Sequence, residues 1–216
     1  MSEYLNNSRE NEQEPGFPAE EYPMTDQLGP VPVKKSKGAK IRSLLLETLQ
    51  TIFLAIVLYL LIDAVIARVR VENISMVPTL NPGEFLIVNK LSYKFSPVQR
   101  GDIVVFHYPN DPREDYIKRV IGVPGDTVAI SESSVFVNGH EIEEPYIANG
   151  YSFESGQWQV PPGSLFVLGD NRKHSSDSQE WGFVPIDNLV GKALMRYWPL
   201  NRIENLSKAY PVRAAN

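Results

Sequence analysis

The stretch KRVIGVPGDTVAI, residues 118–130, contains two short apolar runs that are separated by Pro-Gly-Asp. The runs 119–123 and 127–130 are rich in valine and isoleucine, which favour strands. Proline followed by glycine favours a tight turn. The stretch therefore predicts two short strands joined at residues 124–126, and it indicates a domain built mainly from β-structure.

Similar short apolar runs recur along residues 68–216. Asn138-Gly139 predicts a two-residue hairpin turn, and no amphipathic helix of more than two turns is expected here. The fold class is therefore mostly β, and the polar stretch 138–162 is interpreted as a possible inserted loop or hairpin. Besides 119–123 and 127–130, the expected strands are Phe85–Val88, Ile103–Phe106, Val135–Val137, Leu165–Leu168 and Leu189–Tyr197.

An apolar run from Leu44 to Ala67 precedes this domain. As a helix it would be about 36 Å long, against a hydrocarbon core of about 30 Å. Glu47 and Asp63 lie near its ends, where a charge costs much less than at the centre of a bilayer. We expect residues 43–67 to form one transmembrane helix that anchors the β-rich domain.

Two alternatives to a membrane anchor remain. The uncharged middle of the run, residues 48–62, is short enough for an amphipathic or buried core helix. A cleaved signal peptide is the other alternative, but the run is too long and begins too far from the N-terminus to favour it.

The charges around the run predict its orientation. Residues 1–33 contain seven acidic residues, one arginine and five prolines, a composition typical of a disordered tail. We expect residues 1–42, this stretch and the basic cluster that follows it, to form a disordered tail. By the positive-inside rule this tail lies in the cytoplasm, and 68–216 lie on the periplasmic, extracellular or thylakoid-lumen side. The basic residues that set this orientation are Lys34, Lys35, Lys37, Lys40 and Arg42.

The composition excludes several kinds of protein. The chain has no cysteine, which rules out disulfides, thiol nucleophiles and cysteine metal sites. Its three histidines stand singly, without the spacing of a zinc-binding helix, so no metal site is expected. The net charge is −5, and no basic face suggests nucleic-acid binding. No cofactor is expected either.

Ser75 is a candidate nucleophile in the segment NISMVPTL, residues 73–80. A serine in a loop is usually only a loop residue. Here Pro78 and Pro82-Gly83 favour a turn that exposes the hydroxyl and orients nearby N–H groups. Such donors are needed where an oxyanion develops.

A serine needs a base, and two residues are candidates. His174 lies near Asp170 and Asp177, so a Ser-His-Asp triad is formally possible, although its basic neighbours suggest an exposed turn. Lys118 is the other candidate, because burial can lower the pKa of a lysine to about 7–8. In a strand it would share a face with Tyr116 and Val120. By spacing alone, an ordinary surface lysine is the simpler interpretation.

Four ordered segments resemble the motifs of bacterial type I signal peptidases. They are SMVPTL (75–80), RGDIVVF (100–106), KRVIGVPGD (118–126) and GDNR with its following serine and aspartate (169–178). WGFVP (181–185) and LVGKA (189–193) extend the match. The resemblance covers about residues 44–200 and implies a β-rich Ser/Lys peptidase.

The resemblance also implies roles for individual residues. Ser75 matches the nucleophile, whose own N–H serves the oxyanion, and Lys118 matches the general base. Ser175 matches a hydroxyl that orients the lysine amine. The remaining matches are supporting positions: Asp170, Arg172 and Asp177 near the site, and Tyr116 and Met76 packed around the lysine.

Three departures from the family pattern are informative. Asn73 stands where a branch of the family has a serine that serves the oxyanion hole, and its amide can still donate. Lys173-His174 replace a common Asp-Asn pair. Gln179 replaces a common arginine, so Asp177 cannot form a salt bridge to it, and we expect Arg172 to hold this turn instead.

The resemblance implies a membrane-bound serine endopeptidase that removes N-terminal signal peptides from exported preproteins by an acyl-enzyme route. Its expected partners are these signal peptides, the lipid bilayer and, transiently, the export machinery. Two other readings stay open. One is a Ser/Lys peptidase with a different target, such as a self-cleaving regulator. The other is a tethered β-domain that binds peptides without cutting, against which the presence of both Ser75 and Lys118 argues.

Overall fold

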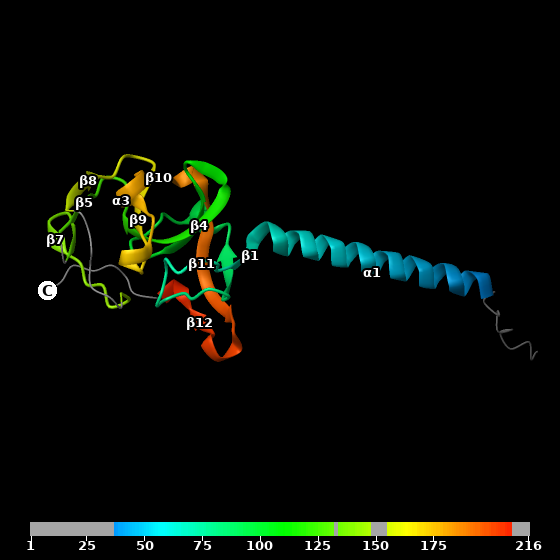
Figure 1. Cartoon of the computed structure of the whole chain (residues 1–216). Coiled ribbons are helices and arrows are strands. Elements are labelled where there is room, and N and C mark those ends of the chain that lie inside the picture. Colours follow the sequence, from blue (N-terminus) through cyan, green and yellow to red (C-terminus); the bar gives the residue numbers. More distant parts are fainter. Residues whose placement is uncertain (1–36, 132–133, 148–154, 209–216) are drawn as a thin grey trace, which may run out of the picture. The chain divides into compact units, whose positions relative to one another are not determined.

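The computed structural model of the chain describes residues 37–131, 134–147 and 155–208 (Figure 1). Of residues 1–42, for which a disordered tail was predicted, 1–36 lie outside the described residues, whereas 37–42 form the beginning of a helix. By its internal contacts the chain divides into two units, residues 1–48 and 49–216. The second unit contains all the strands.

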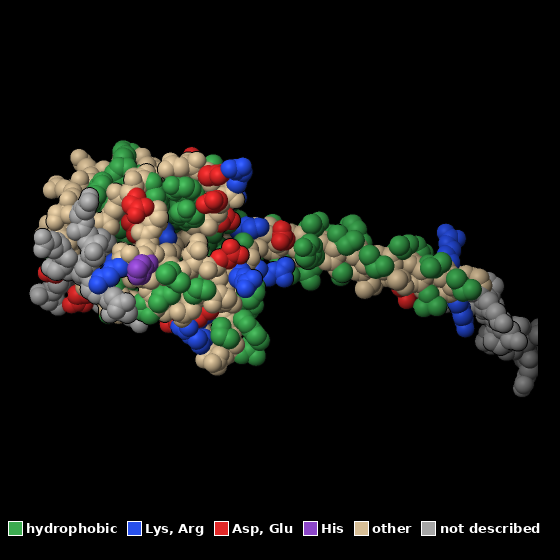
Figure 2. Space-filling model, viewed as in Figure 1, with side chains coloured by type: hydrophobic (Ala, Val, Ile, Leu, Met, Phe, Trp, Pro, Cys, Tyr) green, Lys and Arg blue, Asp and Glu red, His purple; other side chains and the backbone are tan. Residues whose placement is uncertain are grey.

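The apolar run forms helix α1, Lys37–Val65. Residues Lys40–Val65 are long and apolar enough to cross a membrane, and none of this span is buried. Hydrophobic side chains cover the visible face of the helix (Figure 2).

Helix α1 ends two residues before the predicted limit at Ala67, because Ile66–Arg70 form strand β1. Ala67 pairs with Val88 of the neighbouring strand. Lys90 binds two carbonyl groups at the C-terminal end of the helix. Its backbone N–H donates to Val65 O at 2.9 Å, and its Nζ donates to Asp63 O at 2.7 Å. These bonds satisfy carbonyl groups that a helix end otherwise leaves unpaired.

Eight strands form the larger sheet, in the order β1-β2-β11-β3-β4-β9-β10 with β12 paired to β11. Every pairing in it is antiparallel. After β1, its strands are β2 (Phe85–Asn89), β3 (Ile103–Tyr108), β4 (Asp111–Gly122), β9 (Ser164–Leu168), β10 (Val184–Pro185), β11 (Leu189–Trp198) and β12 (Glu204–Asn205).

Strand β4 is longer than predicted. The sequence indicated a strand from Arg119, because only the residues from there on are apolar, but the strand begins at Asp111. Its first half is charged and exposed, and it pairs with β3 in a hairpin, where Asp115 faces His107. Backbone pairing thus extends the strand beyond its hydrophobic part, which a search for apolar runs cannot detect.

A smaller four-stranded sheet has the order β7-β6-β5-β8. The predicted hairpin at Asn138-Gly139 is confirmed: both residues have positive φ, 54° and 82°, and β6 pairs with β7 across them. The stretch 138–162 contributes two strands to this sheet, and within it residues 148–154 lie outside the described part. The strands are β5 (Thr127–Ile130), β6 (Val135–Val137), β7 (His140–Glu141) and β8 (Gly156–Gln159).

The body is mostly β, as predicted, and its helices are short. The apolar parts of β3 and β4 are buried on both faces, because alternate residues enter different hydrophobic clusters. Val104 and Val120 belong to one cluster, whereas Ile103 and Ile117 pack in another. After α1 the helices are α2 (Ser92–Phe95), α3 (Ser178–Trp181) and the 3-10 turns Arg172–His174, Ile186–Asn188, Leu200–Arg202 and Leu206–Lys208.

Candidate functional site

Ser75 lies in a turn between β1 and β2 that is held by buried side chains and by backbone hydrogen bonds. Met76 within the turn and Leu80 directly after it are buried in the core, with exposed fractions of 1% and 0%. The backbone N–H of Leu80 donates to Met76 O at 2.8 Å, and that of Val77 donates to Ile74 O at 3.1 Å. The turn therefore holds Ser75, which is half-buried, on a rigid base.

Lys118 projects from β4 toward this turn. Its Nζ lies 2.8 Å from Ser75 Oγ, within hydrogen-bonding distance. The two residues are 43 positions apart in the sequence. Tyr116, on the same face of β4, places its ring centroid 5.5 Å from the amine. The structure thus brings the two predicted reactive groups into direct contact.

The surroundings of Lys118 favour a neutral amine. Only 4% of the residue is exposed. Burial lowers the pKa of Lys118 from its ordinary value of 10.5 to about 8, while the carboxylates of Asp177 and Asp170 act in the opposite direction. A lysine with such a pKa is neutral in a useful fraction of molecules near neutral pH and can accept a proton.

The loop of residues 169–177 is joined directly to the serine turn. The Asn171 backbone N–H donates to Ser75 O at 2.9 Å, and its side-chain Nδ2 donates to Ile74 O at 3.0 Å. Gly169 permits this close approach, because a Cβ at its position would lie 2.5 Å from Ser75 O and would collide with the side chain of Ser175. The two loops therefore move together or not at all.

Ser175 and Asp177 lie on this loop close to one another. The Ser175 hydroxyl is buried and makes no hydrogen bond within the described part of the chain. Burial raises the pKa of Asp177, while the backbone N–H of Gly169 and the Ser175 hydroxyl act in the opposite direction. The predicted contact from Ser175 to the lysine amine is not formed here.

Asp177 and Arg172 hold the loop without the salt bridge that Gln179 precludes. Asp177 accepts hydrogen bonds from the backbone N–H groups of Gly169, at 3.1 Å, and Gln179, at 3.3 Å. Arg172 Nε donates to Gly169 O at 2.9 Å. The loop is thus fixed at Gly169 on both its N–H and its carbonyl.

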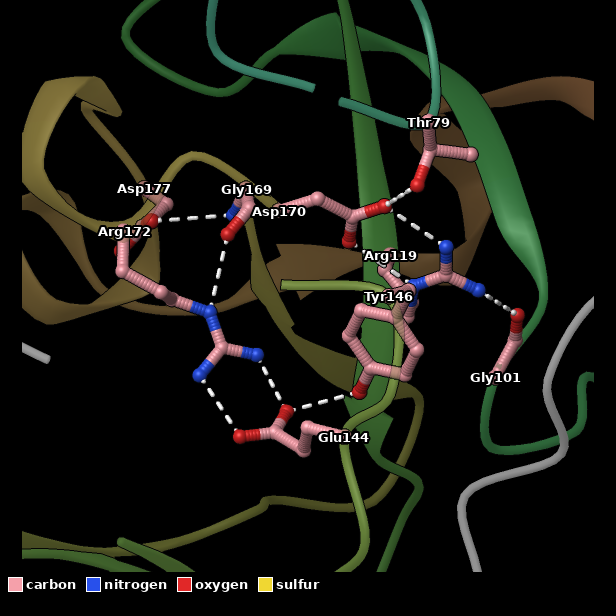
Figure 3. Close-up of polar contacts among 9 residues, drawn as sticks. All are labelled: Thr79, Gly101, Arg119, Glu144, Tyr146, Gly169, Asp170, Arg172 and Asp177. Carbon is pink, nitrogen blue, oxygen red and sulfur yellow. Dashed lines mark hydrogen bonds and ion pairs between the residues drawn. The ribbon is translucent and has the colours of Figure 1, made fainter. Parts of the chain in front are cut away.

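Asp170 belongs to a buried ion pair below the site (Figure 3). Arg119, which follows Lys118 in β4 and points to the opposite face, donates from Nε and Nη2 to its two oxygens at 2.8 and 2.6 Å. The Thr79 hydroxyl donates to the same carboxylate at 2.5 Å. Burial opposes the charge of Arg119, but Asp170 keeps the pKa of the guanidinium above its ordinary value. This pair ties β4 to the serine turn.

A cleft of about 860 Å³ runs past Ser75 and Lys118, between β1 and the exposed half of β4. Asn73 and His174 both line it and are exposed. Asn73 thus lies at the cleft, two residues before the candidate nucleophile. His174 makes no hydrogen bond to Ser75 in the described structure, so the geometry favours Lys118 as the base. Among the described residues, no group of three or more His, Cys, Asp or Glu side chains could hold a metal ion.

Sequence reasoning missed several residues that the structure places in or beneath the site. Asn171 and Arg119 lie inside segments that carry the family resemblance, and their position next to Asp170 and Lys118 was the available signal. Glu144, which pairs with Arg172, lies in the stretch that was interpreted as a possible insertion. No pattern in the sequence relates it to the site.

Comparisons with known proteins identify the family to which the chain is similar. A family model described as signal peptidase, peptidase S26, matches residues 45–198, more than half of the chain. Signal peptidase I of Leptolyngbya laminosa is 44% identical over 176 residues, which cover 77% of this chain and 86% of that protein. Signal peptidase I of Bacillus caldolyticus is 47% identical over 146 residues, covering 61% and 79%. Signal peptidase IB of Staphylococcus aureus is 33% identical, covering 74% and 93%.

Proposed function

The chain belongs to the signal peptidase family, peptidase S26, and from this premise we propose which residues perform its reaction. It is a serine endopeptidase that removes N-terminal signal peptides from exported preproteins. We assign Ser75 as the nucleophile and Lys118 as the general base. The observation that carries the assignment is the 2.8 Å contact between Lys118 Nζ and Ser75 Oγ, with the lysine almost fully buried.

The reaction is an acyl transfer in two stages. As Ser75 Oγ attacks the scissile carbonyl carbon, the neutral Lys118 amine takes the hydroxyl proton. The resulting ammonium then gives this proton to the departing amine, which becomes the new N-terminus of the mature protein. In the second stage Lys118 takes a proton from water, which attacks the ester carbonyl. As the bond from the carbonyl carbon to Ser75 Oγ breaks, the ammonium returns this proton to Ser75 Oγ, and the signal peptide leaves with a free carboxylate.

The oxyanion of each tetrahedral intermediate needs donors that are already in place. The backbone N–H of Ser75 is the first donor that we propose, and the side-chain amide of Asn73 is the second. The exposed position of Asn73 in the cleft, two residues before the nucleophile, supports this role. Removing one such donor costs about 10²- to 10³-fold in kcat in serine peptidases, so Asn73→Ala tests the second donor.

Buried side chains and backbone bonds around the dyad fit the supporting roles that the resemblance implies. Met76 fixes the turn from the core, Tyr116 covers the amine, and Asp177 holds the loop against it. Asp170 and Arg172 act one step further out, through Arg119 and Gly169. We propose that Ser175 orients the amine, a role supported by its buried hydroxyl, which has no hydrogen-bond partner among the described residues.

The rate should rise with pH through the pKa of Lys118. The base must be neutral, and burial holds its pKa at about 8, so kcat should increase up to pH 8 and level off above about pH 9. The measurement is kcat between pH 6 and 10 on a peptide that carries a cleavage site. A limb centred near about 6.5, the ordinary value of histidine, would instead assign the base to His174.

The protein is a membrane-anchored enzyme, and we propose that it crosses the bilayer once through α1. The basic residues before the helix support a cytoplasmic N-terminus, with the catalytic domain on the opposite side. Protease added outside spheroplasts should therefore degrade residues 68–216 and spare the tail. Degradation only after lysis would reverse this orientation. Contact with the export machinery would be transient, and crosslinking during export of a preprotein tests it.

The function is tested with the purified full chain in detergent and a preprotein whose signal peptide ends in Ala-x-Ala. We expect one cut after the second alanine, located by mass spectrometry, and no cut by Ser75→Ala. A cut within this chain alone would favour a self-cleaving regulator. Binding of the signal peptide by the wild-type protein without any cut would favour a peptide-binding module.

A further inference from the structure

Two arginines are completely buried beneath the candidate site, and each pairs with a carboxylate (Figure 3). Arg119 pairs with Asp170, as described above. Arg172 faces Glu144, and its Nη1 and Nη2 donate to the two carboxylate oxygens of Glu144, the first at 2.9 Å. The exposed fraction of the Glu144 side chain is 1%. A bidentate pair in such a position fixes the direction of both side chains.

Tyr146 connects the two arginines. Its hydroxyl donates to Glu144 Oε1 at 2.7 Å. The Arg119 guanidinium carbon lies 3.9 Å from the centroid of its ring, which is the geometry of a cation–π contact. Tyr146 is 3% exposed. Residues 144–146, which follow β7 of the smaller sheet, therefore contact both buried arginines.

Each arginine is connected to one of the two reactive residues, Ser75 or Lys118. Arg172 binds the carbonyl of Gly169, where the loop of residues 169–177 meets the serine turn. Arg119 is the neighbour of Lys118 in β4. The segment 144–146 thus braces the loop beside Ser75 and the strand that carries Lys118 at the same time.

We propose that Glu144 is a positioning residue of this site, one that sets the distance between Ser75 and Lys118 by holding Arg172 and, through it, the loop of residues 169–177. The inference rests on the proposed function. Glu144 touches no reacting atom, so its effect must pass through the loop. The smaller sheet is then part of the active-site support.

A role in positioning differs from simple stabilisation in what it changes. A displacement of about 1 Å in a reacting group can cost about 100-fold in rate. If the loop relaxes, water also reaches Lys118, and the burial that lowers its pKa is weakened. Loss of the brace should therefore lower kcat and move the acid limb of the pH profile upward from pH 8. A purely stabilising residue would change neither quantity in the folded molecules.

The test compares Glu144→Gln with Glu143→Gln in the full-length protein. Glu143 is the adjacent residue and is exposed, so its variant is a matched control. At temperatures well below unfolding, Glu144→Gln should lower kcat by about ten- to 100-fold and leave KM within about twofold of the wild-type value. The midpoint of the acid limb in its pH profile should move to a higher pH. The control should match the wild type. Tyr146→Phe, which keeps the ring over Arg119 but loses the hydrogen bond to Glu144, should act in the same direction more weakly.

One kinetic result overturns the proposal. It is a Glu144→Gln protein that unfolds at a lower temperature but retains the kcat, KM and pH profile of the control. If Glu144→Gln does not fold, Tyr146→Phe decides by the same criteria.

A second measurement separates this inference from the proposed function. Amide hydrogen exchange needs no turnover and can be recorded in a Ser75→Ala background. Glu144→Gln should speed exchange at residues 169–177 and 73–80, where Asn171 N–H binds Ser75 O, and Glu143→Gln should not. Unchanged exchange in both segments would overturn the positioning role. A wild-type protein that cuts no preprotein would instead refute the proposed function, and exchange would still decide the role of Glu144.

Discussion

Lys118→Met is expected to reduce kcat by about 10⁴- to 10⁶-fold, the loss seen when a peptidase loses its nucleophile or its base. Methionine is close to lysine in length and cannot accept a proton. The Ser75 hydroxyl would keep its place but lose the amine 2.8 Å away. Ser75→Ala should lose as much, and the double variant little more, because the two residues act as one unit. Single-turnover cleavage of a preprotein measures all three.

Lys118→Met should leave the protein folded and change how its stability depends on pH. The pKa of Lys118 is about 8 in the folded chain, whereas the unfolded chain has the ordinary lysine value of 10.5. The unfolded chain therefore binds this proton more tightly. The wild-type protein therefore gains stability as pH rises from about 8 to 10.5. Lys118→Met lacks this gain and should melt at or above the wild-type temperature at pH 6.5. Thermal melts at pH 6.5 and 9.5 measure the difference.

His174→Gln is the informative control. We expect it to cleave at close to the wild-type rate, because His174 is exposed and does not bond to Ser75 in the described structure. Cleavage that persists in Lys118→Met and disappears in His174→Gln would show that His174 is the base, and the dyad assignment would be wrong.

Asp170→Ala is expected to cost about 3–5 kcal/mol in the free energy of unfolding, because it leaves a buried arginine without its counter-charge. Arg119 and Asp170 are both fully buried, and the alanine also removes the acceptor of Thr79. For a domain of this size, each kcal/mol lowers the melting temperature by about 2–4 °C. Urea unfolding of the full chain in detergent, followed by tryptophan fluorescence, measures the loss.

An exposed ion pair provides the comparison for the loss of stability expected in Asp170→Ala. Arg113 is 87% exposed and pairs with Asp111 at 2.6 Å. Since solvent screens such a pair, Asp111→Ala should leave the urea midpoint almost unchanged. If Asp111→Ala and Asp170→Ala lowered the free energy of unfolding equally, the burial of Arg119 would not determine how much its ion pair contributes to stability.

The sequence predicts most of the strands and the contact between the two reactive residues, for different reasons. Strands such as Thr127–Ile130 are detectable because their apolar residues are contiguous and are bounded by turn residues. The period of two along β4 correctly places Tyr116, Lys118 and Val120 on one face. The proximity of Ser75 to Lys118 came from the family resemblance, since no local pattern relates residues 43 positions apart.

The residues that sequence reasoning missed depend on contacts between distant segments. Glu144 meets Arg172 across 28 positions, and a glutamate in a polar stretch is usually solvated. Its burial follows from how the smaller sheet packs, which hydrophobic periodicity does not encode. For Asn73 the sequence gives a position and a donor, and its role in the oxyanion hole stays a prediction.

Helix α1 passes into β1 without an intervening loop, and this continuity limits the reach of the enzyme. Ser75 lies ten positions after Val65, the last residue of the helix. Even a fully extended chain of that length covers only about 35 Å. If α1 spans the bilayer as proposed, a peptide bond farther from the lipid surface than this length would be out of reach of Ser75, however well its side chains fit the cleft. Distance from the lipid would then select cleavage sites together with their sequence.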